Sequence, residues 1–235
     1  MNTYNMIFKR RSFHSFRNRN KISEEQLKEI NDFINNVEPL NKNIKVLMEI
    51  VPESETTCRA NGEYCILFYS ETKGEYQRNI GYMGEQIDLF LAERNIGACW
   101  YGMGKAEEKE KDGLSFVILM SIGAVYESAF RKDVKEFKRK SLSDIWKGDD
   151  LGIGETVRLA PSAVNSQPWY VENTGSELRI YRKRRNPLVP LNMNKVDMGI
   201  FLYILECCLK KQGIEYERTL YDERTADKLT AVYSY

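Results

Sequence analysis

The sequence contains almost no histidine and almost no net charge. Among its 235 residues there is one histidine, His14, and 35 basic side chains balance 34 acidic ones to give a net charge of +1. A single histidine argues against a histidine-based catalytic triad, and the charge balance creates no overall field that attracts nucleic acid. If the protein is an enzyme, we expect an organic cofactor to carry the chemistry.

The chain also lacks a membrane-spanning or secretory segment. No apolar run approaches the roughly 20 residues that a helix needs to cross a bilayer. The first five residues, Met1 to Asn5, are polar and do not resemble the apolar core of a secretory signal. We therefore predict a cytoplasmic protein with no nucleic-acid or membrane partner.

Cysteine is present, but not in a metal-binding pattern. No C-x-x-C spacing occurs, and the number of cysteines is odd. With one histidine, this argues against a structural zinc site, so we predict no metal ligands. We expect small apolar core residues in a reducing compartment. The five residues are Cys58, Cys65, Cys99, Cys207 and Cys208.

Hydrophobic content of 42% and charged content of 29% describe a globular chain, long enough for one sizeable domain or two intimate halves.

Ser23 and Gln26 form a capping-box pattern that begins a helix with apolar residues through Val37. Apolar runs predict buried strands at 64–69 and 114–123. We further predict helices at 81–95, 151–159 and 199–213, and strands at 169–171 and 178–181.

The segment from Leu159 to Tyr170 is rich in groups that bind ligands. A serine and two amides lie between two prolines, which fix the backbone. The segment resembles the A-P-S-x-x-N-x-Q-P-W motif of the flavin-dependent nitroreductase family. The resemblance implies that the matching residues contact the flavin cofactor. They are Pro161, Ser162, Ala163, Asn165 and Gln167.

A basic segment near the N-terminus contains Arg10, Arg11, Ser12 and His14. It is consistent with a solvated helix end, because basic residues favour helix C-termini. It is also consistent with a phosphate clamp, because arginine donates paired hydrogen bonds to phosphate. The order resembles the family's R-R-S-x-R-x-F signature, with histidine in place of the last arginine. This replacement weakens the positive charge at neutral pH.

Two further segments resemble parts of the family's flavin site. Residues 96–100, with Gly97, Ala98 and Cys99, are similar to a G-L-G-x-C-W stretch that passes the flavin ring. An ordinary helix-to-strand connection explains them equally well, and we favour a packing role for Cys99. Residues 137–142, with Lys138 and Arg139, resemble the basic segment that closes the phosphate site, although such segments are commonly only solvated. Lys140 is an equal candidate for that contact.

The Ala-Pro-Ser motif lies past the middle of the chain, whereas the family has it near the N-terminus. The expected slot, residues 37–46, keeps a proline and an asparagine but has lost the serine, glutamine and tryptophan. The helices predicted from Gly81 to Asn95 and from Gly199 to Gly213 have equal lengths. We interpret the chain as a duplication. The expected fold is α+β and nitroreductase-like, with two tandem half-repeats, 1–142 and 143–235, forming a single-chain pseudo-dimer of mixed or antiparallel sheets flanked by helices.

The resemblance implies one composite FMN pocket per chain, in which Arg10, Arg11 and Ser12 meet Pro161, Ser162 and Asn165. It implies a two-step oxidoreductase, with NAD(P)H as transient donor to flavin N5 and a flat small-molecule acceptor, such as a nitroaromatic or a quinone. A monomer would suffice to form this pocket.

The main alternative function is that of a flavin-binding protein without turnover, which would serve as a carrier, sensor or partner. A reductive enzyme with another substrate, such as a dehalogenase, is a third possibility.

Overall fold

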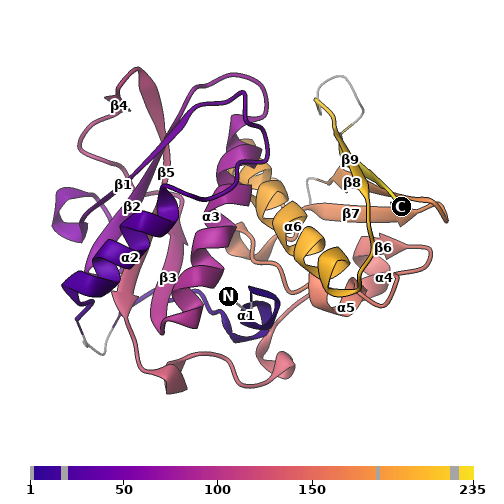
Figure 1. Cartoon of the computed structure of the whole chain (residues 1–235), viewed down its shortest axis with the longest axis horizontal. Helices are drawn as coiled ribbons and strands as arrows, with labels where there is room; N and C mark the ends of the chain where they lie inside the picture. The colour runs from indigo at the N-terminus through magenta and orange to yellow at the C-terminus, as the bar shows by residue number, and fades with distance from the viewer. Residues whose placement is uncertain (1–2, 17–20, 184–185, 223–227) are drawn as a thin grey trace.

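The computed structural model describes residues 3–16, 21–183, 186–222 and 228–235. The chain forms two sheets with two long helices between them, and the first and second parts of the sequence lie on opposite sides (Figure 1). The first sheet contains β1 (Val46–Pro52), β2 (Tyr64–Ser70), β3 (Ile96–Tyr101), β4 (Glu110–Lys111) and β5 (Leu114–Ala124). The second sheet contains β6 (Trp146–Lys147), β7 (Trp169–Asn173), β8 (Glu177–Arg182), β9 (Glu217–Leu220) and β10 (Leu229–Ser234).

The two sheets have matching strand orders. The first runs β1-β2-β5-β3, with β4 paired to β5, and the second runs β6-β7-β8-β10-β9. When β1, β2, β3 and β5 are aligned in chain order with β7, β8, β9 and β10, the orders are the same. All pairings are antiparallel except that of β6 with β7. The predicted α+β class, with two sheets flanked by helices, is confirmed.

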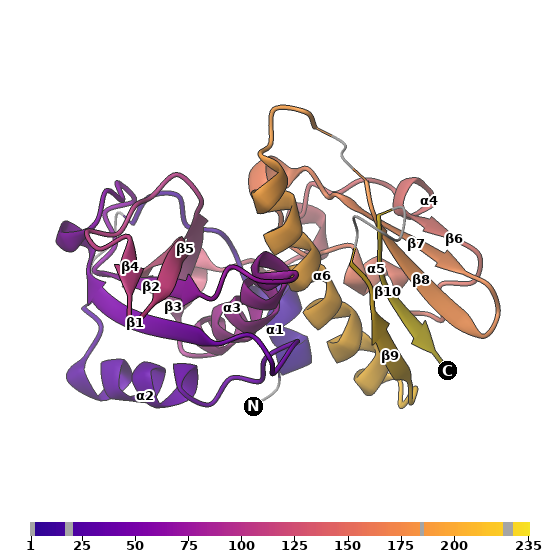
Figure 2. The same cartoon turned by 90° about the horizontal axis from the view of Figure 1, so that it is seen from above.

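Six α-helices complete the described fold. They are α1 (Thr3–Lys9), α2 (Glu24–Ile34), α3 (Tyr76–Glu93), α4 (Leu142–Ile145), α5 (Gly154–Val157) and α6 (Leu191–Lys211). The helices α3 and α6 lie side by side between the sheets, whereas α2 covers the outer part of the first half (Figure 2). The capping box of Ser23 and Gln26 at the start of α2 is present as predicted. None of these helices has the length and apolar character that crossing a membrane requires.

Side chains of β2 alternate between two cores, as expected for a central strand. Ile66 and Phe68 face α2 and α3, and they share a cluster with Ile30 and Ile87. The side chains of Cys65, Leu67 and Tyr69 belong to a different cluster, which Phe13 and Phe16 cover. The strand is therefore buried on both faces, which explains its unbroken apolar run.

The predicted starts of the two long helices are wrong. The helix α3 begins at Tyr76 rather than Gly81, and α6 begins at Leu191 rather than Gly199. Both glycines lie inside their helices, where a Cβ atom on either would collide with the backbone of the other helix. Glycine thus marks the point of closest helix approach instead of a helix start. The positive φ angles of Asn95 and Gly213 do agree with the predicted ends.

Two shorter predictions need correction. Only Gly154–Val157 is helical within the predicted 151–159 helix, because Leu151 and Gly152 have left-handed backbone angles that a helix excludes. The helix α2 ends at Ile34, although Val37 is still buried beyond it. Tertiary packing, rather than helical periodicity, accounts for the burial of Val37.

Candidate functional site

Arg10 follows α1 and is buried, with 1% of its surface exposed. Its Nε atom lies 3.0 Å from Oδ2 of Asp88 on α3. Its Nη2 atom donates a 3.0 Å hydrogen bond to Oγ of Ser12. The first arginine of the predicted phosphate clamp is therefore anchored to a carboxylate of the long helix.

Two more arginines lie near Arg10. Arg131 donates through Nη1 to the backbone carbonyl of Arg10. Burial first, and then the charge of Arg10, lowers the pKa of Arg131 to about 10 and that of Arg139 to about 9. Nearby carboxyl groups oppose this lowering of the pKa only in part: Glu136 and Asp88 act on Arg131, and Glu85 acts on Arg139.

Two carboxyl groups of α3, Glu85 and Asp88, lie at this arginine cluster, and both are buried. Burial is the main cause that raises the pKa of each, and the charge of Asp88 raises the pKa of Glu85 further. The neutral form of Glu85 is thus favoured, and Asp88 pairs with Arg10. The sequence motifs did not mark these residues, but two acidic residues inside an apolar helix are a usable signal, because buried carboxyl groups normally need a partner.

The Ala-Pro-Ser segment forms a strained loop. Its short 3-10 turn contains Val164 with φ of 43° and Asn165 with φ of 56°, and Gln167 follows with φ of 49°. The left-handed region is unfavourable for residues with side chains, and most of all for a β-branched valine. Val164 is 77% exposed, so burial does not offset the strain. Such strain clusters at functional sites, where surrounding contacts fix the backbone.

Three hydrogen bonds fix this loop. Oδ1 of Asp197 on α6 accepts from the backbone N–H of Ala163 at 2.8 Å. Oγ of Ser162 accepts from the N–H of Gln167 at 2.9 Å, and Oε1 of Gln167 accepts from the N–H of Lys140 at 2.9 Å. Burial raises the pKa of Asp197 to about 7. Asp197 is a second site residue that no motif marked.

Arg139 joins the arginine cluster to the strained loop. Its Nη1 atom donates to Oδ1 of Asn165 at 2.9 Å, and its Nη2 atom donates to the carbonyl of Leu159 at 3.0 Å. In return, Nδ2 of Asn165 donates to the carbonyl of Lys138 at 2.6 Å. The basic segment and the Ala-Pro-Ser segment therefore meet directly, and Arg10 is near enough to lower the pKa of Arg139.

Other predicted residues lie further from this meeting point. Arg11 is exposed and donates to the carbonyl of Ala129 at 3.3 Å. The side chain of Lys138 is exposed, so only its carbonyl contributes to the loop. His14 is exposed as well, with Nδ1 3.5 Å from Sγ of Cys99.

Residues 96–100, which were predicted to pass the flavin ring, lie on β3 beside the segment that contains Ser12 and Phe13. Ala98 bridges Ser12, and its carbonyl accepts from the N–H of Phe13 at 3.0 Å. The space that a side chain on Gly97 would fill is occupied by the rings of Phe13 and Phe16. The close approach at Gly97 in this structure is thus to two phenylalanine rings. Burial raises the pKa of Cys99 to about 12, which keeps the thiol neutral.

Residues 37–46, the degenerate segment of the first half, make a backbone contact equivalent to one in the strained loop. Asn41, two residues after Pro39, donates its backbone N–H to Oδ1 of Asn79 on α3 at 2.9 Å. Ala163, two residues after Pro161, makes the same contact with Asp197 on α6. Each loop is therefore held by a side chain of its own half's long helix.

A different polar network lies beside the degenerate segment of the first half, where the duplication would place a second flavin site. Glu206 accepts from Arg218 at 2.5 Å, from the hydroxyl of Tyr82 at 2.7 Å and from that of Tyr233 at 2.8 Å. Arg218 also donates to the carbonyl of Leu40 at 3.2 Å. Arg218 thus forms an ion pair with the carboxylate of Glu206, whereas no ion pair among the described residues includes Arg139.

Two cavities of the described chain lie outside the arginine cluster. One of about 400 Å³ is lined in part by Phe16, Glu53 and Cys58, and another of about 190 Å³ is lined in part by Asn41 and Asn79. None of the predicted flavin-contacting residues lines either cavity. Where the basic segment meets the Ala-Pro-Ser segment, groups of the two segments contact one another, and neither cavity reaches them.

The donors at that meeting point fit a phosphate group. Within the described residues, Nη1 of Arg10 and Nε of Arg139 are buried and have no hydrogen-bond acceptor. A buried donor without an acceptor costs about 1–3 kcal/mol. A phosphate supplies acceptors that suit the fork of arginine. The residues present therefore fit the phosphate end of FMN.

Comparisons with known proteins identify the family. The family model described as putative TM nitroreductase matches residues 2–208. A putative nitroreductase from Thermotoga maritima MSB8 is 24% identical and has a TM-score of 0.69, with 100% of this chain and 94% of that chain covered. This likeness shows the nitroreductase-like fold.

Shorter structures match only part of the chain. A nitroreductase family protein from Clostridium difficile 630 is 16% identical, with a TM-score of 0.46, and covers 61% of this chain and 95% of its own. A putative nitroreductase from Desulfovibrio desulfuricans, solved in complex with FMN, is 15% identical, with a TM-score of 0.44, and covers 60% and 93%. None of the curated proteins compared with the chain matches it. Because the family model covers most of its length, this chain belongs to the putative TM nitroreductase family.

Proposed function

We propose that the protein is an FMN-dependent oxidoreductase of nitroreductase type, with its single cofactor site formed by Arg10, Arg139 and the strained loop. The observation that carries this proposal is a pair of buried guanidinium donors, Nη1 of Arg10 and Nε of Arg139, that lack acceptors within the described residues. When bound, FMN supplies hydride transfer at N5, from NAD(P)H to a flat acceptor such as a nitroaromatic or a quinone. The chain's own residues bind and orient.

The roles of these residues follow from their contacts. Arg10, fixed by Asp88, and Arg139, fixed by Asn165, would direct guanidinium donors to the phosphate. Ser162 would contribute its hydroxyl beside them, since it already holds the loop through the N–H of Gln167. The remaining predicted contacts are proposed for the same cofactor: Arg11, Ser12, His14, Gly97, Ala98, Cys99, Lys138, Pro161, Ala163 and Gln167.

We further propose that the fold is a fused pair of half-repeats, 1–142 and 143–235, that makes one site where a homodimer would make two. The matching strand orders support this. So do the equivalent contacts of Asn79 and Asp197 with the two proline-containing loops. The second site is lost because Glu206 and Arg218 fill it. A monomer is then sufficient, which light scattering of the purified protein tests.

FMN titration tests the cofactor site. Following flavin fluorescence, we expect one equivalent of FMN to bind, and Arg139→Ala to weaken binding about 10- to 100-fold, because it removes charged hydrogen bonds. The double variant Ser162→Ala with Asn165→Ala should also weaken binding. Pro39→Ala, in the equivalent loop of the first half, is the matched control and should bind as the wild type. Equal losses in the control and the double variant would contradict a single site.

Turnover is tested separately on the FMN-loaded protein. Anaerobic addition of NADH or NADPH should bleach the flavin absorbance, and a nitroaromatic or quinone should restore it. A flavin that stays oxidised with both donors would leave a flavin-binding protein without turnover. Failure to bind FMN at all would refute both functions.

A further inference from the structure

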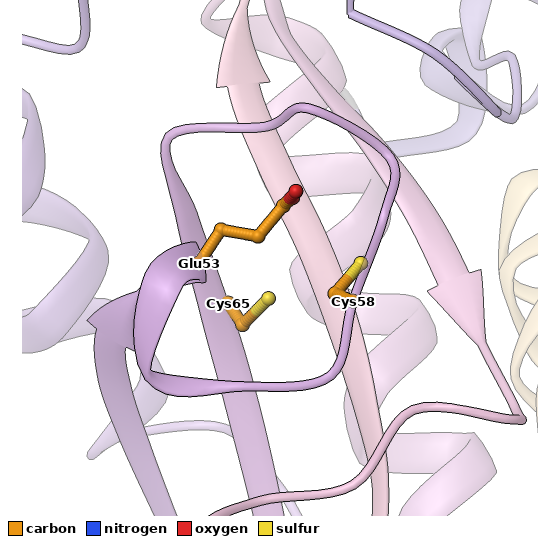
Figure 3. Close-up of side chains that lie close together, drawn as sticks. All are labelled: Glu53, Cys58 and Cys65. Carbon is orange, nitrogen blue, oxygen red and sulfur yellow. The ribbon is translucent and has the colours of Figure 1, made fainter.

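A cluster of metal-ligating side chains lies on the first sheet, outside the arginine cluster. Glu53 begins the short 3-10 helix Glu53–Glu55, Cys58 follows in the same loop, and Cys65 lies on β2. A carboxylate oxygen and the two Sγ atoms all lie within 4.8 Å of one another, and no other such group occurs in the part of the chain that the structure describes. Figure 3 shows the three side chains gathered within the loop that joins β1 to β2.

Against the expectation from the cysteine spacing, we propose that Glu53, Cys58 and Cys65 bind one Zn²⁺ ion through two thiolates and one carboxylate. Zinc takes tetrahedral sets of sulfur and oxygen ligands, with Zn–S near 2.3 Å, which places two sulfur ligands about 3.8 Å apart. The atoms, already within 4.8 Å, need to approach by at most about 1 Å. Three protein ligands with an open fourth position is a zinc arrangement found in catalytic sites.

The carboxylate is already oriented by the groups behind it. Oε2 of Glu53 accepts from Oγ of Ser121 at 2.7 Å and from the N–H of Gly62 at 2.8 Å, and Oε1 accepts from the N–H of Asn61 at 2.8 Å. Metal-ligating carboxylates characteristically have such outer hydrogen bonds. Gly62 permits this approach, because a Cβ atom there would lie 2.8 Å from Oε2.

The two thiols are held on rigid backbone. Cys65 pairs with Ser121 of β5 in the centre of the sheet, and its Sγ atom lies 3.6 Å from Oγ1 of Thr56. The same hydroxyl accepts from the N–H of Cys58 at 3.1 Å. The loop that carries Cys58 is thus tied to the strand that carries Cys65.

The site has an entry path. Glu53 and Cys58 line the cavity of about 400 Å³, so an ion can reach the ligands from this side and keep its fourth position open there. Lys21 and Arg59 line the same cavity. Their positive charges offset the negative charge that two thiolates and a carboxylate leave after binding Zn²⁺.

The experiment uses full-length protein, reduced with a phosphine and freed of metal by a chelator. Competition between the protein and a chromophoric zinc chelator should give one high-affinity equivalent of Zn²⁺. We expect Cys58→Ser to weaken binding at least about 100-fold and Glu53→Gln at least about 10-fold, on the scale that ligand-shell changes produce. Cys207→Ser, which changes a thiol on α6, is the matched control and should bind as the wild type.

A Co²⁺ titration of the wild-type protein is a second test, and its result does not depend on whether any variant folds. The expected result is the thiolate-to-cobalt charge-transfer band in the near ultraviolet, with tetrahedral bands in the visible region. A wild type that gives no such bands, or that loses two titratable thiols to a disulfide in air despite excess Zn²⁺, would overturn the proposal. Binding that survives Cys58→Ser unchanged would overturn it too. FMN binding has no part in either measurement, so the outcome is independent of the proposed oxidoreductase function.

Discussion

Gly81 of α3 and Gly199 of α6 lie against each other's helices in a reciprocal way. A Cβ atom on Gly81 would collide with the carbonyl oxygen of Val196, and one on Gly199 would collide with that of Arg78. Each contacted carbonyl belongs to the residue three positions before the other glycine. The contacts are thus reciprocal, and glycine at the crossing lets the two helix backbones approach closely.

Gly199→Ala should destabilise the protein, although alanine is the better helix former by about 1 kcal/mol. The added methyl group has no space at the crossing, so we expect a net loss of about 1–3 kcal/mol in the free energy of unfolding. Urea denaturation measures this as a lower midpoint with an unchanged slope. Lys210→Ala, at an exposed position of the same helix, should have little effect. A Gly199→Ala protein as stable as the wild type would show that the helices do not touch there.

Arg10→Ala should destabilise the protein far more than Arg11→Ala. Arg10 pairs with the buried Asp88, and removing one partner of a buried pair costs about 3–5 kcal/mol. Burial raises the pKa of Asp88 and the Arg10 charge opposes this, so removing Arg10 should raise that pKa further and make the loss smaller at lower pH. Urea midpoints at pH 5 and pH 8 test both points. Similar losses from the two substitutions would contradict the buried pair, because Arg11 is exposed.

Asp197→Asn should remove a pH dependence of stability. Burial raises the pKa of Asp197 from 3.8 to about 7, so the folded protein keeps a proton that the unfolded chain has lost between these values. Wild-type stability should therefore fall relative to the variant as pH rises from about 4 to about 7, by up to ~1.4 kcal/mol per unit, and then level off. The groups facing Asp197 are Asn194, Ser166 and the N–H of Ala163.

The amide is expected to replace the carboxylate without loss of the loop contact, because Asn79 makes the equivalent contact in the first half. The measurement is the difference in urea midpoint between the two proteins at each pH. A constant difference from pH 4 to pH 8 would refute the buried, proton-binding role of Asp197.

Local features of this fold were accessible from the sequence because they depend on neighbours along the chain. The capping box at Ser23 and the apolar runs of β2 and β5 are of this kind. The family motifs were accessible for the same reason, since they are short contiguous segments. Helix starts were not, because Gly81 looks like a boundary until a second helix is packed against it.

The sequence by itself therefore determined the family, the α+β class and the segments of the candidate site. Tertiary structure alone decided which side chains meet: Asp88 with Arg10, Asp197 with the strained loop, and Glu53 with Cys58 and Cys65. These partners come from distant elements, or have spacings that match no motif. Burial gives their charges and thiols their chemistry, and burial is a property of the packed chain rather than of any segment.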